Sequence, residues 1–266
     1  MTLRLLTLNL QHGLPAVGAP RAGQLPDARS LREAAGELAA VGADVVLLQE
    51  VDKDQPRSGR ADQARLLAAE LGMPYHRFAA SVAGNVTGLR IGARRSQVRG
   101  AGYGVALLSR YPVRSWHVLP LPGAGLRLRR GDLLGWSLGG WYPQLDGRRV
   151  CLAAVIRTPE GPVSVAVTHL STVPETARRQ LARCVQALGT LPGPRLLGGD
   201  LNLLPADVSA VTGWRALAGA HTFTNARPRK QLDHLLSDGV TAAGPGRAHH
   251  LGISDHAGLS VDVRLG

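Results

Sequence analysis

The sequence predicts an α/β fold with mixed β-sheets, and three observations support this class. Predicted strands and helices alternate along most of the 266 residues, which is typical of α/β proteins. Hairpin signals interrupt the alternation, so some neighbouring strands are expected to run antiparallel. No repeat of solenoid length and no linker divides the chain, so residues 1–266 are expected to form a single domain.

Four elements are predicted in the first part of the chain. Apart from Asp44, the run at 43–48 is apolar at successive positions, which indicates a strand that is buried on both faces and covered by helices or by a second sheet. Ser30 and Glu33 have the spacing of a capping box, with Ser30 as the helix cap. The four elements are a strand over 3–10, a helix over 30–41, the strand over 43–48 and a helix over 61–71.

The rest of the chain contains several further strands and one helix. Residues 81–102 are rich in glycine and arginine without apolar periodicity, which predicts a basic loop. Asp146-Gly147 is a hairpin turn signal. The segment 120–147 is an irregular insertion that fits a substrate-facing lid, a membrane-touching element or a long hairpin. Strands are predicted over 103–109, 113–119, 149–157, 163–168, 195–198, 232–236 and 258–265, and a helix over 174–189.

The composition is that of a globular protein with an excess of positive charge. Hydrophobic residues make up 44% of the chain, which excludes a disordered or collagen-like protein. Lysine and arginine total 31 against 19 acidic residues, and the net charge of +12 would attract phosphate-rich partners. Lys53 and Lys230 are the only lysines, so a bias towards arginine codons can explain part of the excess. The basic segments 89–99 and 227–230 either grip phosphates or form a solvated surface.

Cysteine usage and hydropathy give predictions about the environment of the protein. Cys151 and Cys184 are too isolated for a disulfide framework or a zinc cluster and are expected in the core. No run approaches the roughly 18 apolar residues of a membrane span, and the start lacks a signal-peptide pattern, which predicts a cytoplasmic protein without a transmembrane segment. The oligomeric state is left open. Packing in the core or at strand edges is expected for most of the large aromatic residues, which are Trp116, Trp136, Trp141, Tyr142 and Trp214.

Polar side chains stand at the ends of six predicted strands. Each one alone has a plain structural explanation, as a turn residue, a solvated strand end or a buried histidine. Ligands of α/β proteins bind beyond strand ends, so together these side chains define a candidate site. They are Asn9, Glu50, His169, Asp200 with Asn202, Asp233, and Asp255 with His256.

The chemistry of these side chains favours a hard metal ion. Carboxylate and amide oxygens suit Mg²⁺, with Mn²⁺ as the alternative. A zinc site would need clustered cysteine or histidine, such as His-Glu-x-x-His, and the sequence has no such motif. Because Mg²⁺ needs only one or two carboxylates besides water and phosphate oxygens, Glu50 is the first candidate ligand.

Seven short motifs carry these residues in a fixed order. The series resembles the endonuclease/exonuclease/phosphatase superfamily of metal-dependent phosphoesterases, which includes deoxyribonuclease I, abasic-site endonucleases of the exonuclease III type, neutral sphingomyelinases and inositol-polyphosphate 5-phosphatases. The motifs are Thr7-Leu8-Asn9-Leu10, Leu48-Gln49-Glu50-Val51, Tyr103-Gly104-Val105-Ala106-Leu107-Leu108-Ser109-Arg110, Thr168-His169-Leu170, Gly199-Asp200-Leu201-Asn202, Leu232-Asp233-His234 and Ser254-Asp255-His256.

The resemblance implies a fold and a metal site. The fold is a four-layer α/β/β/α sandwich, in which two mixed sheets are flanked by helices, with the site at one end. By this similarity Glu50 holds the divalent cation, and Asn9 and Asp255 are direct or water-mediated ligands.

The resemblance also implies the catalytic roles. Asp200 would orient or deprotonate the attacking water, and Asn202 would bind phosphoryl oxygens. His256 would contact the phosphate while Asp233 holds its ring. His169 would stabilise the pentacoordinate phosphorane or the leaving group.

Three other positions are interpreted differently. Tyr103 is a candidate because its phenol can touch phosphate, although packing on the strand is an equally simple explanation. His234 follows Asp233, and alternation along a strand would point it away from the site. The pair His249-His250 is expected in a loop.

Three functional hypotheses remain. The first is a Mg²⁺-dependent phosphodiesterase acting on nucleic acid, which the positive charge and the lack of a signal peptide favour. The second is the same chemistry on a phospholipid head group or a small phosphate ester. The third is a non-catalytic binding module, which the complete set of catalytic residues disfavours.

Overall fold

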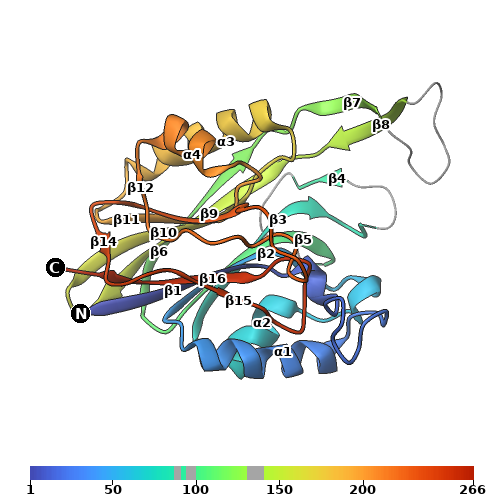
Figure 1. Cartoon of the computed structure of the whole chain (residues 1–266), viewed down its shortest axis with the longest axis horizontal. Coiled ribbons are helices and arrows are strands. Elements are labelled where there is room, and N and C mark those ends of the chain that lie inside the picture. The colour runs from blue at the N-terminus through green and yellow to red at the C-terminus, as the bar shows by residue number, and fades with distance from the viewer. Residues whose placement is uncertain (87–90, 94–99, 131–140) are drawn as a thin grey trace.

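The molecule is a sandwich of two β-sheets with a layer of helices on each outer face (Figure 1). The computed structural model describes residues 1–86, 91–93, 100–130 and 141–266. The predicted α/β/β/α architecture with two mixed sheets is confirmed.

The first sheet has eight strands. β1 and β2 are parallel and form its centre, whereas β16 pairs with β1 in the antiparallel direction, so the sheet is mixed. Its strand order is β14 (Thr241–Ala242), β16 (Gly258–Arg264), β1 (Thr2–Asn9), β2 (Val45–Lys53), β5 (Gly102–Ser109), β3 (Tyr75–Ala83) and β4 (Ile91–Gly92), with β15 (Arg247–His249) also paired to β16.

The second sheet has six strands and is also mixed. β10 and β11 are parallel, and the helix between them in sequence makes the crossover that parallel strands require. Its strand order is β12 (Arg215–Ala216), β13 (Asp233–Asp238), β11 (Arg195–Asp200), β10 (Gly161–His169), β9 (Arg149–Thr158) and β6 (Val113–Leu121).

The helices form the outer layers because each has an apolar face to bury. α1 (Ala28–Val41) and α2 (Gln63–Glu70) cover the first sheet, and α3 (Pro174–Leu188) and α4 (Pro205–Thr212) cover the second (Figure 1). Two short 3-10 turns, Gln11–Gly13 and Pro56–Ser58, follow β1 and β2. None of the helices in the described part of the chain is long and apolar enough to cross a bilayer.

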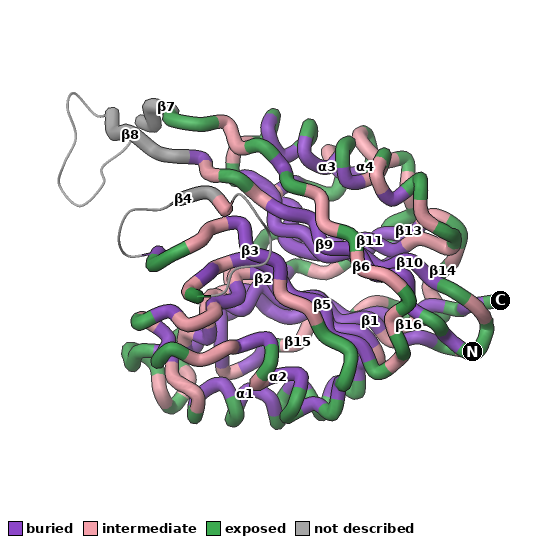
Figure 2. Tube along the Cα trace, turned by 180° about the vertical axis from the view of Figure 1, so that it is seen from behind, coloured by how far each residue is buried: buried purple, intermediate pink, exposed green. Residues whose placement is uncertain are grey.

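The central strands of both sheets are almost entirely buried and are drawn mostly in purple in Figure 2, whereas the outer strand β6 is largely half-buried or exposed. In β2, Val45 and Leu47 contribute to the core between the sheets, while Val46 and Leu48 pack against α1 and α2. This confirms the interpretation of the apolar run at 43–48. Cys151 of β9 and Cys184 of α3 are free thiols buried in the core between this helix and the second sheet, as predicted.

Several local predictions differ from the structure. The predicted loop at 81–102 contains the end of β3 and the short β4, and β5 already begins at Gly102. Helix α4 and the short strands β12, β14 and β15 were not predicted. Strand β2 continues to Lys53, beyond the predicted end at residue 48.

The segment 120–147 forms a long hairpin in its described part, which is one of the three alternatives. β7 (Gly125–Arg130) pairs with β8 (Trp141–Asp146), and this pair continues the pairing of β6 with β9 outwards from the sandwich (Figure 1). Asp146-Gly147 therefore connects β8 to β9 along one side of the long hairpin and is not the predicted turn. Residues 131–140 lie outside the described residues, and so does Trp136.

Helix α1 begins before residue 30, because Asp27 is its N-cap. The Asp27 carboxylate accepts a hydrogen bond from the Ser30 backbone N–H at 2.7 Å, and the Ser30 hydroxyl accepts one from the Asp27 N–H at 3.0 Å. The predicted capping box of Ser30 with Glu33 is therefore wrong. Glu33 instead forms an ion pair with Arg29.

This cap gives a testable prediction about stability. Asp27→Ala is expected to lower the free energy of unfolding by about 0.5–2 kcal/mol. The hydrogen bond from the Ser30 backbone, together with Arg21, lowers the pKa of Asp27 in the folded state. Such a carboxylate stabilises the fold above its unfolded pKa, and the contribution is lost as the pH falls through the folded pKa.

Urea unfolding at pH 7 and pH 3 checks the prediction, with Asp27→Asn as the matched variant that retains a capping oxygen. The stability difference between wild type and Asp27→Asn should shrink at the lower pH. A difference of the same size at both pH values would contradict the assigned ionic contribution.

Candidate active site

The polar strand ends named above meet at one end of the sandwich. Asn9, His169 and Asp200 are the last residues of β1, β10 and β11, and Asp233 is the first residue of β13. The register places His169 beside Asp200 and Asp200 beside Asp233 in the second sheet. The chain termini lie together at the opposite end (Figure 1).

Glu50 reaches this end because β2 is irregular there. The register of β2 with β5 shifts between Leu48 and Val51, and a bulge of this kind re-aims side chains at active sites. Glu50 has a φ of +53°, and Asn202 and Ser254 also have positive φ angles of +50° and +70°. Such conformations cost on the order of 1–3 kcal/mol each and concentrate at functional sites.

Asn9 joins the two sheets at the site. Its Nδ2 donates hydrogen bonds to Glu50 Oε1 at 3.2 Å and to Asp200 Oδ2 at 3.1 Å, so one amide links carboxylates from different sheets. The Ser254 hydroxyl donates to the Asn9 carbonyl oxygen at 2.6 Å and holds the end of β1 in place.

Asp200 lies at the centre of the cluster and is almost fully buried. Its Oδ2 is 3.4 Å from His169 Nε2 and 3.8 Å from His256 Nε2, and its Oδ1 accepts a hydrogen bond from the Asn202 backbone N–H at 3.0 Å. Burial and the negative charge of Asp233 raise the pKa of Asp200 to about 7. Asp200 is therefore a carboxyl group that can exchange a proton near neutral pH.

His256 and Asp233 form a buried pair. His256 Nδ1 is 2.8 Å from Asp233 Oδ2, which fixes the ring orientation. Burial alone would lower the pKa of His256, but the hydrogen bond and charge of Asp233, helped by Asp200 and Asp255, raise it to about 9. The ring is therefore a cation at neutral pH. The ring of Phe223 packs on it at a centroid distance of 4.9 Å.

His169 has the opposite protonation preference. It is buried, and burial, together with the positive charges of Arg149 and His256, lowers its pKa well below the ordinary value. The site therefore combines one neutral and one cationic imidazole around a single carboxylate.

The remaining predicted residues lie around this cluster. Asn202 Nδ2 donates to the Leu170 carbonyl oxygen at 3.1 Å, which leaves its second amide hydrogen available. Asp255 is partly buried and its charge acts on His256. The backbone N–H of Asp255 donates to Gln11 Oε1, and its carbonyl oxygen accepts from the Asn225 N–H, so the main chain at this position is held on both sides.

The donor set fits a hydrated hard cation. Among the described residues, no three Asp, Glu, His or Cys side chains gather closely enough to form a complete metal cage. Mg²⁺ does not require such a cage, because it retains several waters and binds through one or two carboxylates. Glu50 is only partly buried and one of its oxygens is held by Asn9, so its carboxylate is oriented and accessible.

Tyr103 lies beside Glu50 and is partly buried. Burial and the Glu50 carboxylate raise its pKa, so the phenol stays protonated. The guanidinium of Arg57 lies 5.3 Å from the centre of its ring, and Asp52 holds that guanidinium through two hydrogen bonds of 2.9 and 2.8 Å.

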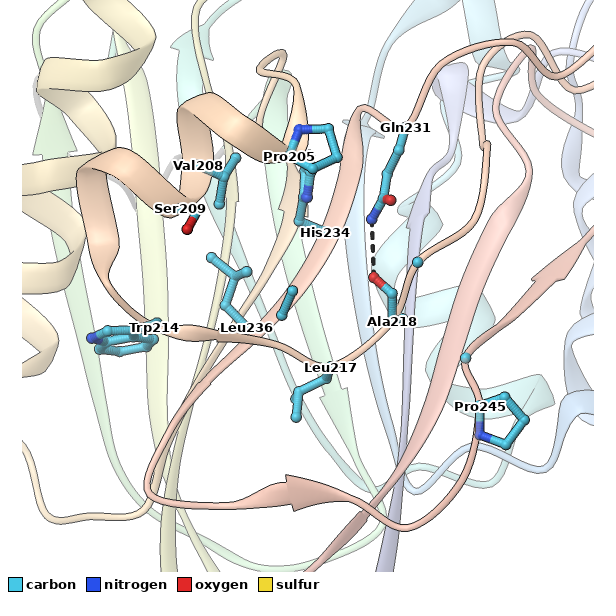
Figure 3. Close-up of a pocket in the computed structure, with 13 residues that line it drawn as sticks. Pro205, Val208, Ser209, Trp214, Leu217, Ala218, Gln231, His234, Leu236 and Pro245 are labelled. Atoms are coloured by element: carbon cyan, nitrogen blue, oxygen red, sulfur yellow. Dashed lines mark hydrogen bonds between the residues drawn. The ribbon is translucent and has the colours of Figure 1, made fainter.

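His234 points away from the site, as strand alternation predicts. Its Nε2 is 2.9 Å from the carbonyl oxygen of Leu203, and Figure 3 shows its ring beside Pro205 and Val208 of α4 in a separate pocket. The prediction of a loop for His249-His250 is wrong for His249, which ends β15 and contacts the Ser260 hydroxyl at 2.7 Å.

The structure describes only some of the large aromatic residues and basic segments that were considered as substrate contacts. Trp116 and Trp214 are partly buried against the cores, whereas most of the segment 89–99 and the side chains of Trp141 and Tyr142 lie outside the described residues. In the segment 227–230, Arg227, Arg229 and Lys230 are exposed in the described structure.

Several residues near the site were not predicted. Ser254 lies in one of the seven motifs, but only the structure shows that it holds Asn9 and accepts a hydrogen bond from the His256 N–H at 3.0 Å. Phe223 and Arg149 carry no local sequence signal, and only the fold brings them to the catalytic residues. A buried acid two residues after Glu50 could have indicated the Asp52–Arg57 pair.

Comparison with known proteins agrees with this architecture. Residues 6–256 match the model of the Endonuclease/Exonuclease/phosphatase family. A solved endonuclease/exonuclease/phosphatase from Beutenbergia cavernae is similar at 24% identity and a TM-score of 0.70, covering 100% of this chain and 72% of that chain. No curated protein matches the sequence.

Two solved enzymes share the fold at lower identity. A mannosyl-6-phosphatase from Bacteroides thetaiotaomicron is 15% identical with a TM-score of 0.65, over 98% of this chain and 99% of that chain. Sphingomyelinase C from Streptomyces griseocarneus is 18% identical with a TM-score of 0.62, again over 98% and 99%. Because the family match spans nearly the whole sequence, the chain belongs to the endonuclease/exonuclease/phosphatase family and is a hydrolase of phosphoester bonds.

Proposed function

We propose that the chain hydrolyses phosphodiester bonds with Mg²⁺ and that its substrate is nucleic acid. The observation that carries this proposal is the placement of Asp200 between Asn9, His169 and His256, with Glu50 held beside it. The arrangement supplies a base, a cation and an oriented metal ligand within one cluster. Hydrolysis of a phosphodiester requires each of these functions.

The proposed mechanism follows from the protonation states. Asp200 accepts the proton of the attacking water, because its pKa of about 7 is matched to neutral pH. The His256 imidazolium, held by Asp233, stabilises the charge on the phosphoryl oxygens. The available amide hydrogen of Asn202 binds the same oxygens. Neutral His169 hydrogen-bonds to the departing oxygen.

A metal ion would be held by Glu50, with Asn9 and Asp255 as direct or water-mediated ligands. When bound, Mg²⁺ or Mn²⁺ supplies Lewis-acid stabilisation of the phosphoryl group. Asn9 has a second role in this proposal, because its amide keeps the Glu50 and Asp200 carboxylates at a fixed separation.

Nucleic acid is the proposed substrate because of the charge around the site. The bridge between Phe223 and Lys230 closes a turn that carries the exposed Arg227 and Arg229, and Phe223 itself contacts His256. Exposed cations beside a phosphate-cleaving site would bind the neighbouring phosphates of a polyanion. The net charge of +12 supports the same substrate class, and a cytoplasmic location stays a prediction.

A substrate panel tests the proposal. Plasmid DNA, abasic duplex, RNA, sphingomyelin vesicles and phosphoinositides are each incubated with Mg²⁺, Mn²⁺ or EDTA. We expect cleavage of DNA or RNA that EDTA abolishes and that weakens steeply as salt rises, because phosphate contacts release counterions. Turnover of the lipids without cleavage of nucleic acid would overturn the substrate class. No turnover of any substrate would overturn the proposed chemistry.

A further inference from the structure

A cavity of about 480 Å³ lies beside the catalytic cluster. Ser81 and Tyr103 form one wall, from β3 and β5 of the first sheet. Gly123 and Asp146, at the base of the β7–β8 hairpin, form the other wall together with Arg148 and Arg149, which lead into β9. Its volume is within the range of about 300–1,000 Å³ that holds small ligands or parts of larger ones.

Two residues of the lining, Tyr103 and Arg149, lie close to the catalytic residues. Tyr103 lies next to Glu50, whose charge acts on the phenol. Arg149 precedes Val150, whose carbonyl oxygen accepts a hydrogen bond of 3.1 Å from Thr168, the neighbour of His169. Arg149 therefore lies between the cavity and the proposed leaving-group side of the site.

The wall formed by the hairpin base is held rigidly. Asp146 Oδ2 accepts hydrogen bonds from the Ala124 backbone N–H at 2.8 Å and from the Ser171 hydroxyl at 2.7 Å. A Cβ atom on Gly123 would lie 2.2 Å from the carbonyl oxygens of Asp146 and Gly147, so only glycine permits this close packing. A cavity that is already formed requires little ordering when a ligand binds.

The cations of the cavity are available to a ligand. The cavity is lined by Arg148 and Arg149, and in the described part of the chain no carboxylate pairs with either of them. Arg57 and Arg195, which lie outside the cavity, are by contrast paired with Asp52 and Asp238. The single acid of the lining, Asp146, is buried and already accepts two hydrogen bonds on one oxygen. An unpaired guanidinium binds phosphate through parallel hydrogen bonds.

We infer that this cavity is a second anion subsite, in which Arg148 and Arg149 bind a phosphate of the substrate other than the one that is cleaved. The inference rests on the proposed function and narrows its substrate class. Such a subsite favours phosphodiesters that carry a second phosphate near the scissile bond over those whose single phosphate is the one that is cleaved.

Two matched substrates test the subsite. They are the p-nitrophenyl ester of thymidine 5′-phosphate and the same ester with an added 3′-phosphate. We expect kcat/KM to be about tenfold higher for the second compound in the wild type, the effect of one charge-assisted hydrogen-bonding contact. The ratio should fall towards one in Arg148→Gln. Arg157→Gln, an exposed arginine near the other end of β9, should keep the wild-type ratio.

A second substrate pair distinguishes the sources of the phosphate. The second pair consists of glycerophosphoinositol and glycerophosphoinositol that carries a further phosphate at position 4 of the ring. The ratio of their kcat/KM values is measured from the products released. A higher ratio in the thymidine pair identifies a nucleic-acid phosphate, a higher ratio in the inositol pair identifies a head-group phosphate, and either supports the subsite. Ratios near one in both pairs, or an unchanged ratio in Arg148→Gln, overturn it.

Binding measurements keep the two proposals apart. Calorimetry compares thymidine 3′,5′-bisphosphate with thymidine 5′-phosphate in wild type and in Arg148→Gln. A wild-type binding preference that is lost in the variant supports the subsite even when no ester is hydrolysed, in which case only the proposed function fails. Equal affinities for the two nucleotides, together with a ratio near one in the inositol pair, overturn the subsite.

Discussion

Replacing Asp200 with asparagine is expected to lower kcat for phosphodiester hydrolysis by about 10²–10⁴-fold, the usual contribution of a positioned general base. Asp200 is the acceptor around which Asn9, His169 and His256 are arranged. Asparagine has nearly the same shape but cannot take a proton from water. Steady-state hydrolysis of bis-p-nitrophenyl phosphate in Mg²⁺ measures the effect.

The control for this variant is Asp238→Asn. Asp238 lies at the far end of β13 in the same sheet and pairs with Arg195 at 2.7 Å, away from the cluster. It should retain the wild-type kcat. A folded Asp200→Asn enzyme with an almost unchanged kcat would contradict the role assigned to this carboxylate.

Removing the His256 imidazole is expected to damage both catalysis and stability. His256→Ala should lower kcat by about 10²-fold or more, because the cation facing the phosphoryl oxygens is lost. It should also lower the free energy of unfolding by about 3–5 kcal/mol, because breaking a buried ion pair leaves a charge without its partner. Asp233 is fully buried and its Oδ1 has no partner among the described residues, so the imidazole is its main compensation.

The double variant His256→Ala, Asp233→Asn separates these two effects. Neutralising the carboxylate should restore much of the lost stability, since an uncharged amide is less costly to bury. It should not restore activity. Chemical denaturation and kcat measured on the two single variants and the double variant form the required cycle. Additive stability losses would contradict the ion-pair assignment.

The central strands could be predicted because the apolar residues within each strand already indicate that it is buried. The run at 43–48 is apolar on both faces, and β2 is indeed covered by the other sheet and by helices. β3 could not be predicted in the same way, because its sequence is mixed and its position depends on pairing with β5. The two-residue strands β12 and β14 likewise exist only through their pairing with β13 and β16.

Turn and cap signals were less informative because they depend on the surrounding chain. Asp146-Gly147 has the composition of a hairpin turn. However, β9 pairs with β6 and β10, and the chain before it pairs as β8 with β7, so the two residues lie within the long hairpin and not at its turn. Ser30 has the right chemistry for a cap, but Asp27 is in extended conformation one turn earlier and takes that position.

The positions of the site residues follow from a simple geometric rule. The ends of parallel strands meet at one edge, and both sheets of the sandwich present such an edge at the same end. Asn9, Asp200 and His256 could therefore be grouped from sequence, and the structure brings them together. Arg149 could not, because nothing local distinguishes it from the other arginines. Its significance comes from its position beside His169.

The metal-dependent role of Asp200 is tested most directly by the turnover of bis-p-nitrophenyl phosphate by wild type and Asp200→Asn, in EDTA and after Mg²⁺ is restored. We expect wild type to be inactive in EDTA and to recover with Mg²⁺, whereas Asp200→Asn should stay at least about 10²-fold slower than wild type once Mg²⁺ is restored. Wild-type turnover that persists in EDTA, or full recovery of Asp200→Asn with Mg²⁺, would contradict this role.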